Sequence, residues 1–103
     1  MTDEQINAAI AEACGWENVG RYPKSRNVWV GKHAGRLQEV PDYCTDLNAM
    51  AEAEKVLDSD ELFKGYYLAL YDITQSTRWP ICATAKQRAE AFLRTLGKWE
   101  GDV

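Results

Sequence analysis

The fold prediction depends on Pro41-Asp42-Tyr43-Cys44-Thr45-Asp46-Leu47-Asn48-Ala49-Met50, where a predicted strand gives way to a helix. Val40 precedes a proline, which disfavours helical backbone and ends the strand there. Thr45 or Asp46 can then cap the following helix, because a short polar side chain accepts hydrogen bonds from the free N–H groups of a first turn. The stretch therefore predicts a strand up to residue 40 and a helix over 46–57.

Further helices are predicted where capping residues precede apolar side chains at the 3.6-residue period. Thr2 with Gln5, and Thr84 with Gln87, have the spacing of a capping box, in which each side chain bonds to the other residue's backbone N–H. A similar arrangement stands at 58–61. The predicted helices cover 3–14, 46–57, 60–75 and 84–97, and we expect their stripes to share one core in which Phe92 packs near Ile10 and Met50.

Strand prediction centres on the β-branched and aromatic residues around Trp29. Strands near 27–32 and 36–40 would form a hairpin with glycines in its turn, and alternation places Trp29 either in a second buried face or on an exposed platform. A third strand is predicted near 79–83, and 17–27 is predicted to be a loop. The β propensity of 66–73 leaves a strand as the alternative to the third helix.

Together these elements predict an α+β fold in one domain over 1–103. It has a small three-stranded, mainly antiparallel sheet packed by about four helices, in the order αββααβα. A chain of 103 residues with 46% hydrophobic content is long enough for one such core and too short for two ordinary ones.

Composition predicts a soluble protein of a reduced cytoplasm. The net charge is −4 and the pI is about 4.9, which argues against general nucleic-acid binding and against an anionic membrane as partner. No apolar run approaches the roughly 18 to 20 residues that cross a bilayer. The opening residues 2–5 are polar rather than a basic and apolar leader. Cys14, Cys44 and Cys82 are odd in number and widely spaced, as free thiols are.

Positive charge is concentrated in one segment of this acidic chain. Residues 18–38 contain five Lys and Arg and no Asp or Glu, and aromatic residues lie in or beside the segment. Aromatic rings next to Arg and Lys hold bases and phosphates by stacking and charge-assisted hydrogen bonds, although an ordinary solvated loop has the same composition. The predicted ligand-binding residues are Arg21, Tyr22, Arg26, Trp29, Lys32, His33, Arg36 and Tyr43.

Catalytic and metal sites are not indicated by the sequence. His33 is the only histidine, and no Ser or Cys has a spacing that pairs with it. The three cysteines lack the paired spacing of zinc ligands. Asp42 and Asp46 could hold magnesium or act as acid and base, but turn formation and helix capping account for both. We therefore predict no catalytic residues, no metal and no cofactor.

Three segments resemble a family of small proteins from tailed phages and prophages that carry the phage alpha-beta-alpha sandwich domain. They are Ile6-Asn7 through Gly15-Trp16, Pro41 through Met50 with Glu52-Ala53-Glu54-Lys55, and Ala83-Thr84-Ala85 with Gln87 through Arg94. Family members usually carry His after the Met, whereas this chain has Ala51. The basic segment lies where family members differ most, as a specificity region on a common scaffold would.

The resemblance implies a phage accessory protein that acts in the cytoplasm of the bacterial host. Combined with the basic segment, it predicts a non-enzymatic counter-defence protein that sequesters an anionic nucleotide signal. One alternative is an inhibitor that binds an acidic surface of a host protein, and another is a small nucleotide-processing enzyme. Self-association of the chain is left open.

Overall fold

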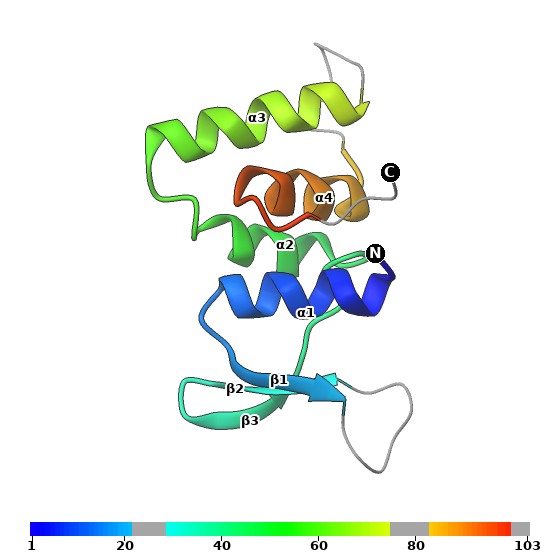
Figure 1. Ribbon diagram of the computed structural model, residues 1–103, viewed down its shortest axis with the longest axis vertical. Coiled ribbons are helices and arrows are strands. Elements are labelled where there is room, and N and C mark those ends of the chain that lie inside the picture. Colours follow the sequence, from blue (N-terminus) through cyan, green and yellow to red (C-terminus); the bar gives the residue numbers. More distant parts are fainter. Residues whose placement is uncertain (22–28, 75–82, 100–103) are drawn as a thin grey trace.

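The computed structural model describes residues 1–21, 29–74 and 83–99 of the chain. Within these residues it has four helices and one antiparallel sheet of three strands in the order β1-β2-β3, which confirms the predicted α+β class (Figure 1). The elements follow the chain in the order α1 (Asp3–Ala13), β1 (Glu17–Arg21), β2 (Trp29–His33), β3 (Arg36–Glu39), α2 (Leu47–Glu54), α3 (Asp60–Thr74) and α4 (Ala85–Thr95).

The molecule is elongated, with extents of 44 × 27 × 24 Å. The sheet lies at one end of the long axis and α3 at the other, and α1, α2 and α4 lie between them (Figure 1). All four described helices lie on the same side of the sheet. One end of the molecule is therefore a β-hairpin region, and the opposite end is a single helix.

The predicted helix starts are confirmed by their side-chain hydrogen bonds. The Thr2 hydroxyl accepts from Gln5 N at 3.2 Å, and the Gln5 side chain accepts from Thr2 N at 2.8 Å. Thr84 and Gln87 form the same box at the start of α4. Asp46 caps α2 by accepting from two backbone N–H groups. No described helix is long and apolar enough to cross a membrane.

The sheet differs from the prediction in its first strand. Residues 17–21 were predicted as loop, but they pair with β2, with Glu17 opposite Lys32 and Arg21 opposite Trp29. The register shifts between Glu17 and Gly20, and Asn18 has a φ of 52°, so neither strand nor helix periodicity is visible there. Most of the predicted strand near 79–83 lies outside the described residues, and Ala83 is not in a strand.

The core lies where α1, α2 and α4 meet. Phe92, Ile10 and Met50 are completely buried in one cluster, which confirms the predicted centre. Residues 66–73 belong to α3, so the strand alternative for them is wrong. Tyr66 of this helix points into the same cluster, because the helical period rather than local β propensity decides which side chains are buried.

Candidate functional site

The structure places the eight predicted ligand-binding residues in different environments. Tyr22 and Arg26 lie outside the described residues, and Arg21 ends β1. Lys32, His33 and Arg36 are exposed on the hairpin of β2 and β3. The remaining two aromatic residues are at least partly buried, and they are treated below.

The register of the hairpin separates its positive side chains. His33 pairs with Arg36, and Lys32 pairs with Leu37. Residues directly opposite each other share a face, and successive residues alternate, so His33 and Arg36 lie on one face and Lys32 on the other. The basic residues of the hairpin therefore do not form one surface.

His33 lies on the face that turns towards α1. Its imidazole stacks on the indole of Trp16, with ring centroids 4.9 Å apart and planes 9° apart. Gly31 is on the same face, and a Cβ there would lie 3.1 Å from the Trp16 ring. Trp16 itself packs back on α1 through a hydrogen bond from its backbone N to Ala11 O. The exposed His33 thus lies over a buried aromatic ring.

Tyr43 was predicted to be an exposed binding residue, and the structure corrects this because only 4% of it is accessible. Asn7 of α1 holds the turn that contains Tyr43 against that helix. Its side-chain oxygen accepts from Cys44 N at 3.2 Å, and its amide donates to Asp42 at 3.1 Å. These bonds turn the phenol ring inwards, where it packs in the main core cluster.

A hollow of about 300 Å³ lies between the hairpin, the end of α1 and α2. His33 and Trp16 form one wall and Tyr43 another, while the small side chains of Ala49 and Ala53, four residues apart on α2, leave the space open. We call this hollow the His33 pocket. It is lined by Cys14, Trp16, His33, Pro41, Tyr43, Ala49, Glu52, Ala53 and Val56.

Two ionisable groups of the His33 pocket have pKa values that are raised by burial. Burial raises the pKa of Cys14 to about 11. Burial, with a smaller effect of Cys14, raises the pKa of Tyr43 to about 12. Both groups are therefore protonated near pH 7, and a protonated thiol is a poor nucleophile. Glu52 is exposed and forms an ion pair with Lys55 at 3.0 Å.

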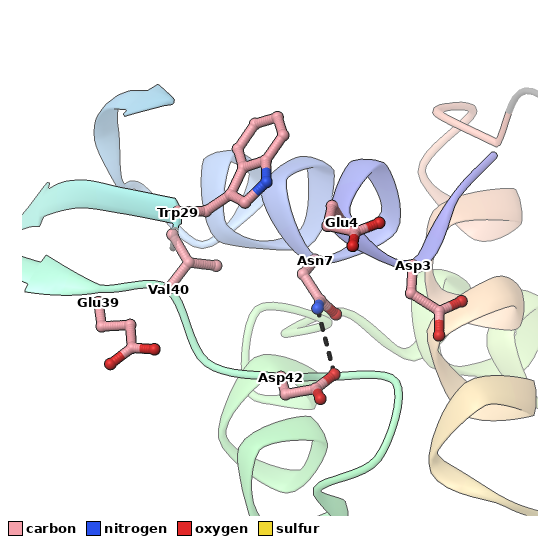
Figure 2. A pocket seen from close by; sticks show the side chains of 7 residues that line it. All are labelled: Asp3, Glu4, Asn7, Trp29, Glu39, Val40 and Asp42. Atoms are coloured by element: carbon pink, nitrogen blue, oxygen red, sulfur yellow. Dashed lines mark hydrogen bonds between the residues drawn. The ribbon is translucent and has the colours of Figure 1, made fainter. Parts of the chain in front are cut away.

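A second hollow of about 280 Å³ lies at the other side of the sheet–helix junction. Figure 2 shows Asp3, Glu4 and Asn7 of α1 on one side of it, with Trp29 of the hairpin and Asp42 opposite. With Glu39 it is lined by four carboxylates, so its potential repels an anion. Trp29, half-buried against the core, lines this acidic hollow and not the His33 pocket.

No metal-binding group of three or more His, Cys, Asp or Glu side chains exists in the part of the chain that the structure describes. The four carboxylates of the acidic hollow are used in part within the fold. Asp3 forms an ion pair with Lys86 at 3.0 Å, and Asp42 accepts the hydrogen bond from Asn7. The ion pair and the hydrogen bond thus connect the start of α1 to α4 and to the turn before α2.

Sequence reasoning named His33 and Tyr43 and missed the other residues that line the His33 pocket. The contact between Trp16 and His33 depends on β1, which pairs with the strand that ends at His33. The small residues Ala49 and Ala53 were a visible signal, because two alanines four apart on a helix face leave room beside it.

Comparison with known proteins adds no relative to these observations: no family model, no curated protein and no solved structure matches the chain.

Proposed function

We propose that the protein is a non-catalytic binding protein that holds a small phosphorylated nucleoside at the His33 pocket. The observation that carries the proposal is an aromatic pocket wall with one positive side chain, that of Arg36, next to it on the hairpin. His33 stacks on Trp16 at the pocket wall, and Arg36 is its cross-strand partner on the same face. A base would enter the apolar hollow, and the phosphate would stay at the rim beside Arg36.

The size and chemistry of the pocket support a ligand of this class. Its volume of about 300 Å³ is at the lower end for small-molecule sites, which suits one base or nucleoside rather than a long oligonucleotide. Aromatic faces bind bases of any kind by stacking, and a guanidinium pairs with phosphate through charge-assisted hydrogen bonds. Glu52 would accept a hydrogen bond from an exocyclic amino group of the base.

Sequestration of a nucleotide gives the protein its role in the phage setting that the resemblance implies. A host that signals infection with a nucleotide loses that signal when a phage protein holds it, without any chemical change to the ligand. The thiol of Cys14 and the phenol of Tyr43 keep their protons near pH 7, which supports holding of the ligand over turnover.

The test measures binding of mono-, di- and cyclic nucleotides by native mass spectrometry and titration calorimetry. Arg36→Ser and His33→Ala should each weaken binding by roughly tenfold or more, and binding should weaken with added salt. Lys32→Ser is the matched control, because it removes the same charge from the opposite face of the same hairpin. Its effect should be less than about threefold, as expected for a distant surface charge.

Three results would overturn the proposal. They are no binding by any nucleotide of the panel, an equal loss in Lys32→Ser and Arg36→Ser, and recovery of a chemically altered nucleotide after the protein is denatured. The last result would identify a nucleotide-processing enzyme. Capture of a host protein by a chain that binds no nucleotide would identify an inhibitor instead.

A further inference from the structure

The outer face of α3 exposes four large apolar or aromatic side chains. Phe63, Tyr67, Leu68 and Tyr71 are 53%, 47%, 56% and 41% exposed. Helix α3 is at one end of the molecule and packs mainly on α4, with Tyr66 and Leu70 on its buried side (Figure 1). Single exposed apolar residues are common, but several on one helix face mark an interaction surface.

These residues form two rows along the helix, each with a step of four residues. Phe63, Tyr67 and Tyr71 make the first row, and Lys64, Leu68 and Asp72 make the second. Residues four apart lie one above the other on a helix surface. The first row is aromatic throughout, and the second has a positive end, an apolar middle and a negative end.

Both rows are complementary to themselves when a second helix runs in the opposite direction. A two-fold axis at the level of Tyr67 and Leu68 places Phe63 of each copy opposite Tyr71 of the other. The same axis places Lys64 of each copy opposite Asp72 of the other, since both lie four residues from Leu68. A parallel pair would instead bring Lys64 against Lys64, which is unfavourable.

We propose that two copies of this chain form a symmetric dimer by antiparallel packing of their α3 helices through these two rows. Lys64 forms no ion pair within residues 1–21, 29–74 and 83–99, so its charge is available to the second copy. Asp72 lies 3.4 Å from Arg94 and keeps most of its side chain exposed, so it can accept a second cation.

The apolar area agrees with a weak dimer. Large side chains offer roughly 150–250 Å² each, so four that are about half exposed present roughly 400 Å² per copy. Stable complexes bury about 800 Å² per partner, of which the polar rim supplies a part. We therefore expect a dimer that dissociates in the micromolar range.

The charges around the patch favour a second copy over a membrane. Helices that lie on membranes carry Lys and Arg along the edges of their apolar face. Here the edges carry Asp60, Glu61 and Asp72, with Lys64 as the only nearby cation on α3. The carboxylates at these edges are repelled by anionic lipid, whereas Lys64 and Asp72 can pair with Asp72 and Lys64 of an antiparallel second copy.

Sedimentation equilibrium from roughly 5 to 500 µM, a range chosen to span dissociation of an interface of this size, tests the proposal. The unchanged chain should pass from monomer to dimer in this range. Tyr67→Ser should weaken the dimer at least about tenfold, because Tyr67 lies at the centre of the contact. Leu37→Ser is the control: Leu37 is 64% exposed but lies at the sheet end, and its loss should leave the dimer unchanged.

A charge exchange tests the antiparallel register. Lys64→Asp and Asp72→Lys should each weaken the dimer roughly fivefold, and the two together should restore it, because each copy then offers the reversed pair. Circular dichroism should show an unchanged helix content in every variant. A chain that stays monomeric at the highest concentration, or a double variant no better than the singles, would overturn the proposal. So would flotation of the monomer with phosphatidylcholine vesicles.

Discussion

The two ends of the molecule present opposite surfaces on the two sides of one core. The sheet end carries Lys32, His33 and Arg36 on a hairpin that contacts the core through Trp29 and through the stacking of His33 on Trp16. The α3 end is acidic and exposes aromatic side chains. The two proposed binding functions, one for a small anion and one for a second copy of the chain, therefore lie at opposite ends of the molecule.

The difference also concerns how each end is attached. Helix α3 lies along α4 over most of its length, with Tyr66 and Leu70 buried. Among the described residues the helices cover one face of the sheet, at the junction with α1, where the contact through Trp16, Val19 and Gly31 is tight. Changes at the sheet junction should therefore meet steric limits that changes on α3 do not. Two of the four predictions below, at Gly31 and Gly65, test this directly, and the four are given in order of decreasing effect.

The largest effect is expected at the residue on which both ends depend. Phe92 of α4 is completely buried in the cluster that includes Trp16 on the sheet side and Tyr66 on the α3 side. Phe92→Ala should lower the free energy of unfolding by about 3–5 kcal/mol, because it removes apolar contacts and leaves a cavity. Urea denaturation followed by both tryptophan fluorescence and far-UV circular dichroism measures it.

Leu47→Ala is the matched control, since Leu47 is an exposed residue of α2, and its cost should be under about 0.5 kcal/mol. The two probes should give coincident transitions in Phe92→Ala and in the unchanged chain. Separate transitions would mean that the sheet end and the α3 end unfold independently, and an unchanged midpoint would place Phe92 outside the core.

The next effect is a loss of stability in alkaline solution. Burial raises the pKa of Cys14 to about 11 and those of Cys44 and Tyr43 to about 12, from ordinary values of 9.0 for the thiols and 10.0 for the phenol. Between these values the unfolded chain has released protons that the folded chain still holds. The stabilisation is complete below about pH 9 and is lost as pH rises towards 12.

At about pH 10.5 the Cys44 thiol alone should lower the free energy of unfolding by roughly 2 kcal/mol relative to about pH 8. This pH is about 1.5 units above the thiol's ordinary pKa of 9.0, and each unit corresponds to about 1.36 kcal/mol while the folded thiol stays protonated. Urea denaturation under reducing conditions at both pH values checks this. Cys44→Ala should show a smaller decrease over the same range, because it has lost one of the titrating groups. Equal decreases in the two chains would show that Cys44 ionises as easily in the folded state as in the unfolded one.

Sequence reasoning succeeded where the cause of a structure lies within a few residues of it. The capping boxes of Thr2 with Gln5 and of Thr84 with Gln87 each act over three positions, and both helices were predicted from them. The hairpin turn is equally local, because Ala34 and Gly35 both take positive φ values, as a two-residue hairpin turn requires.

Prediction failed where the cause lies far along the chain. Strand β1 has an irregular register and a residue at positive φ, so it is a strand only because β2 pairs with it. Tyr43 is buried because Asn7 holds its turn from another helix. The candidate site shows the same limit. His33 was found from its basic neighbours, whereas its stacking partner Trp16 lies 17 residues earlier in the chain, before the strand β1 that was not predicted.

The third prediction tests the tight contact at the sheet junction. A Cβ on Gly31 would lie 2.9 Å from Val19 Cγ2, 3.1 Å from Trp16 Cε3 and 3.3 Å from Glu17 O. Gly31→Ala should therefore cost about 1–3 kcal/mol through overpacking, although alanine is otherwise the better strand residue. Urea denaturation measures the cost, and near-UV circular dichroism reports whether Trp16 moves. Gly20→Ala in β1 is the control, because its Cβ would meet nothing within 4 Å.

The smallest effect has the opposite sign and lies at the other end of the molecule. Gly65 is inside α3, and its Cβ would meet only Thr95 Cγ2 at 3.6 Å, which is an ordinary contact. Gly65→Ala should stabilise the protein by about 1 kcal/mol, because alanine loses less backbone freedom in a helix, and should raise the melting temperature by about 4–8 °C. Gly15→Ala is the control: space is open there too, but φ is +91°, so alanine is strained and the melting temperature should fall. A decrease in Gly65→Ala would show that α3 and α4 lie too close for a methyl group, and that the α3 end is packed as tightly as the sheet junction.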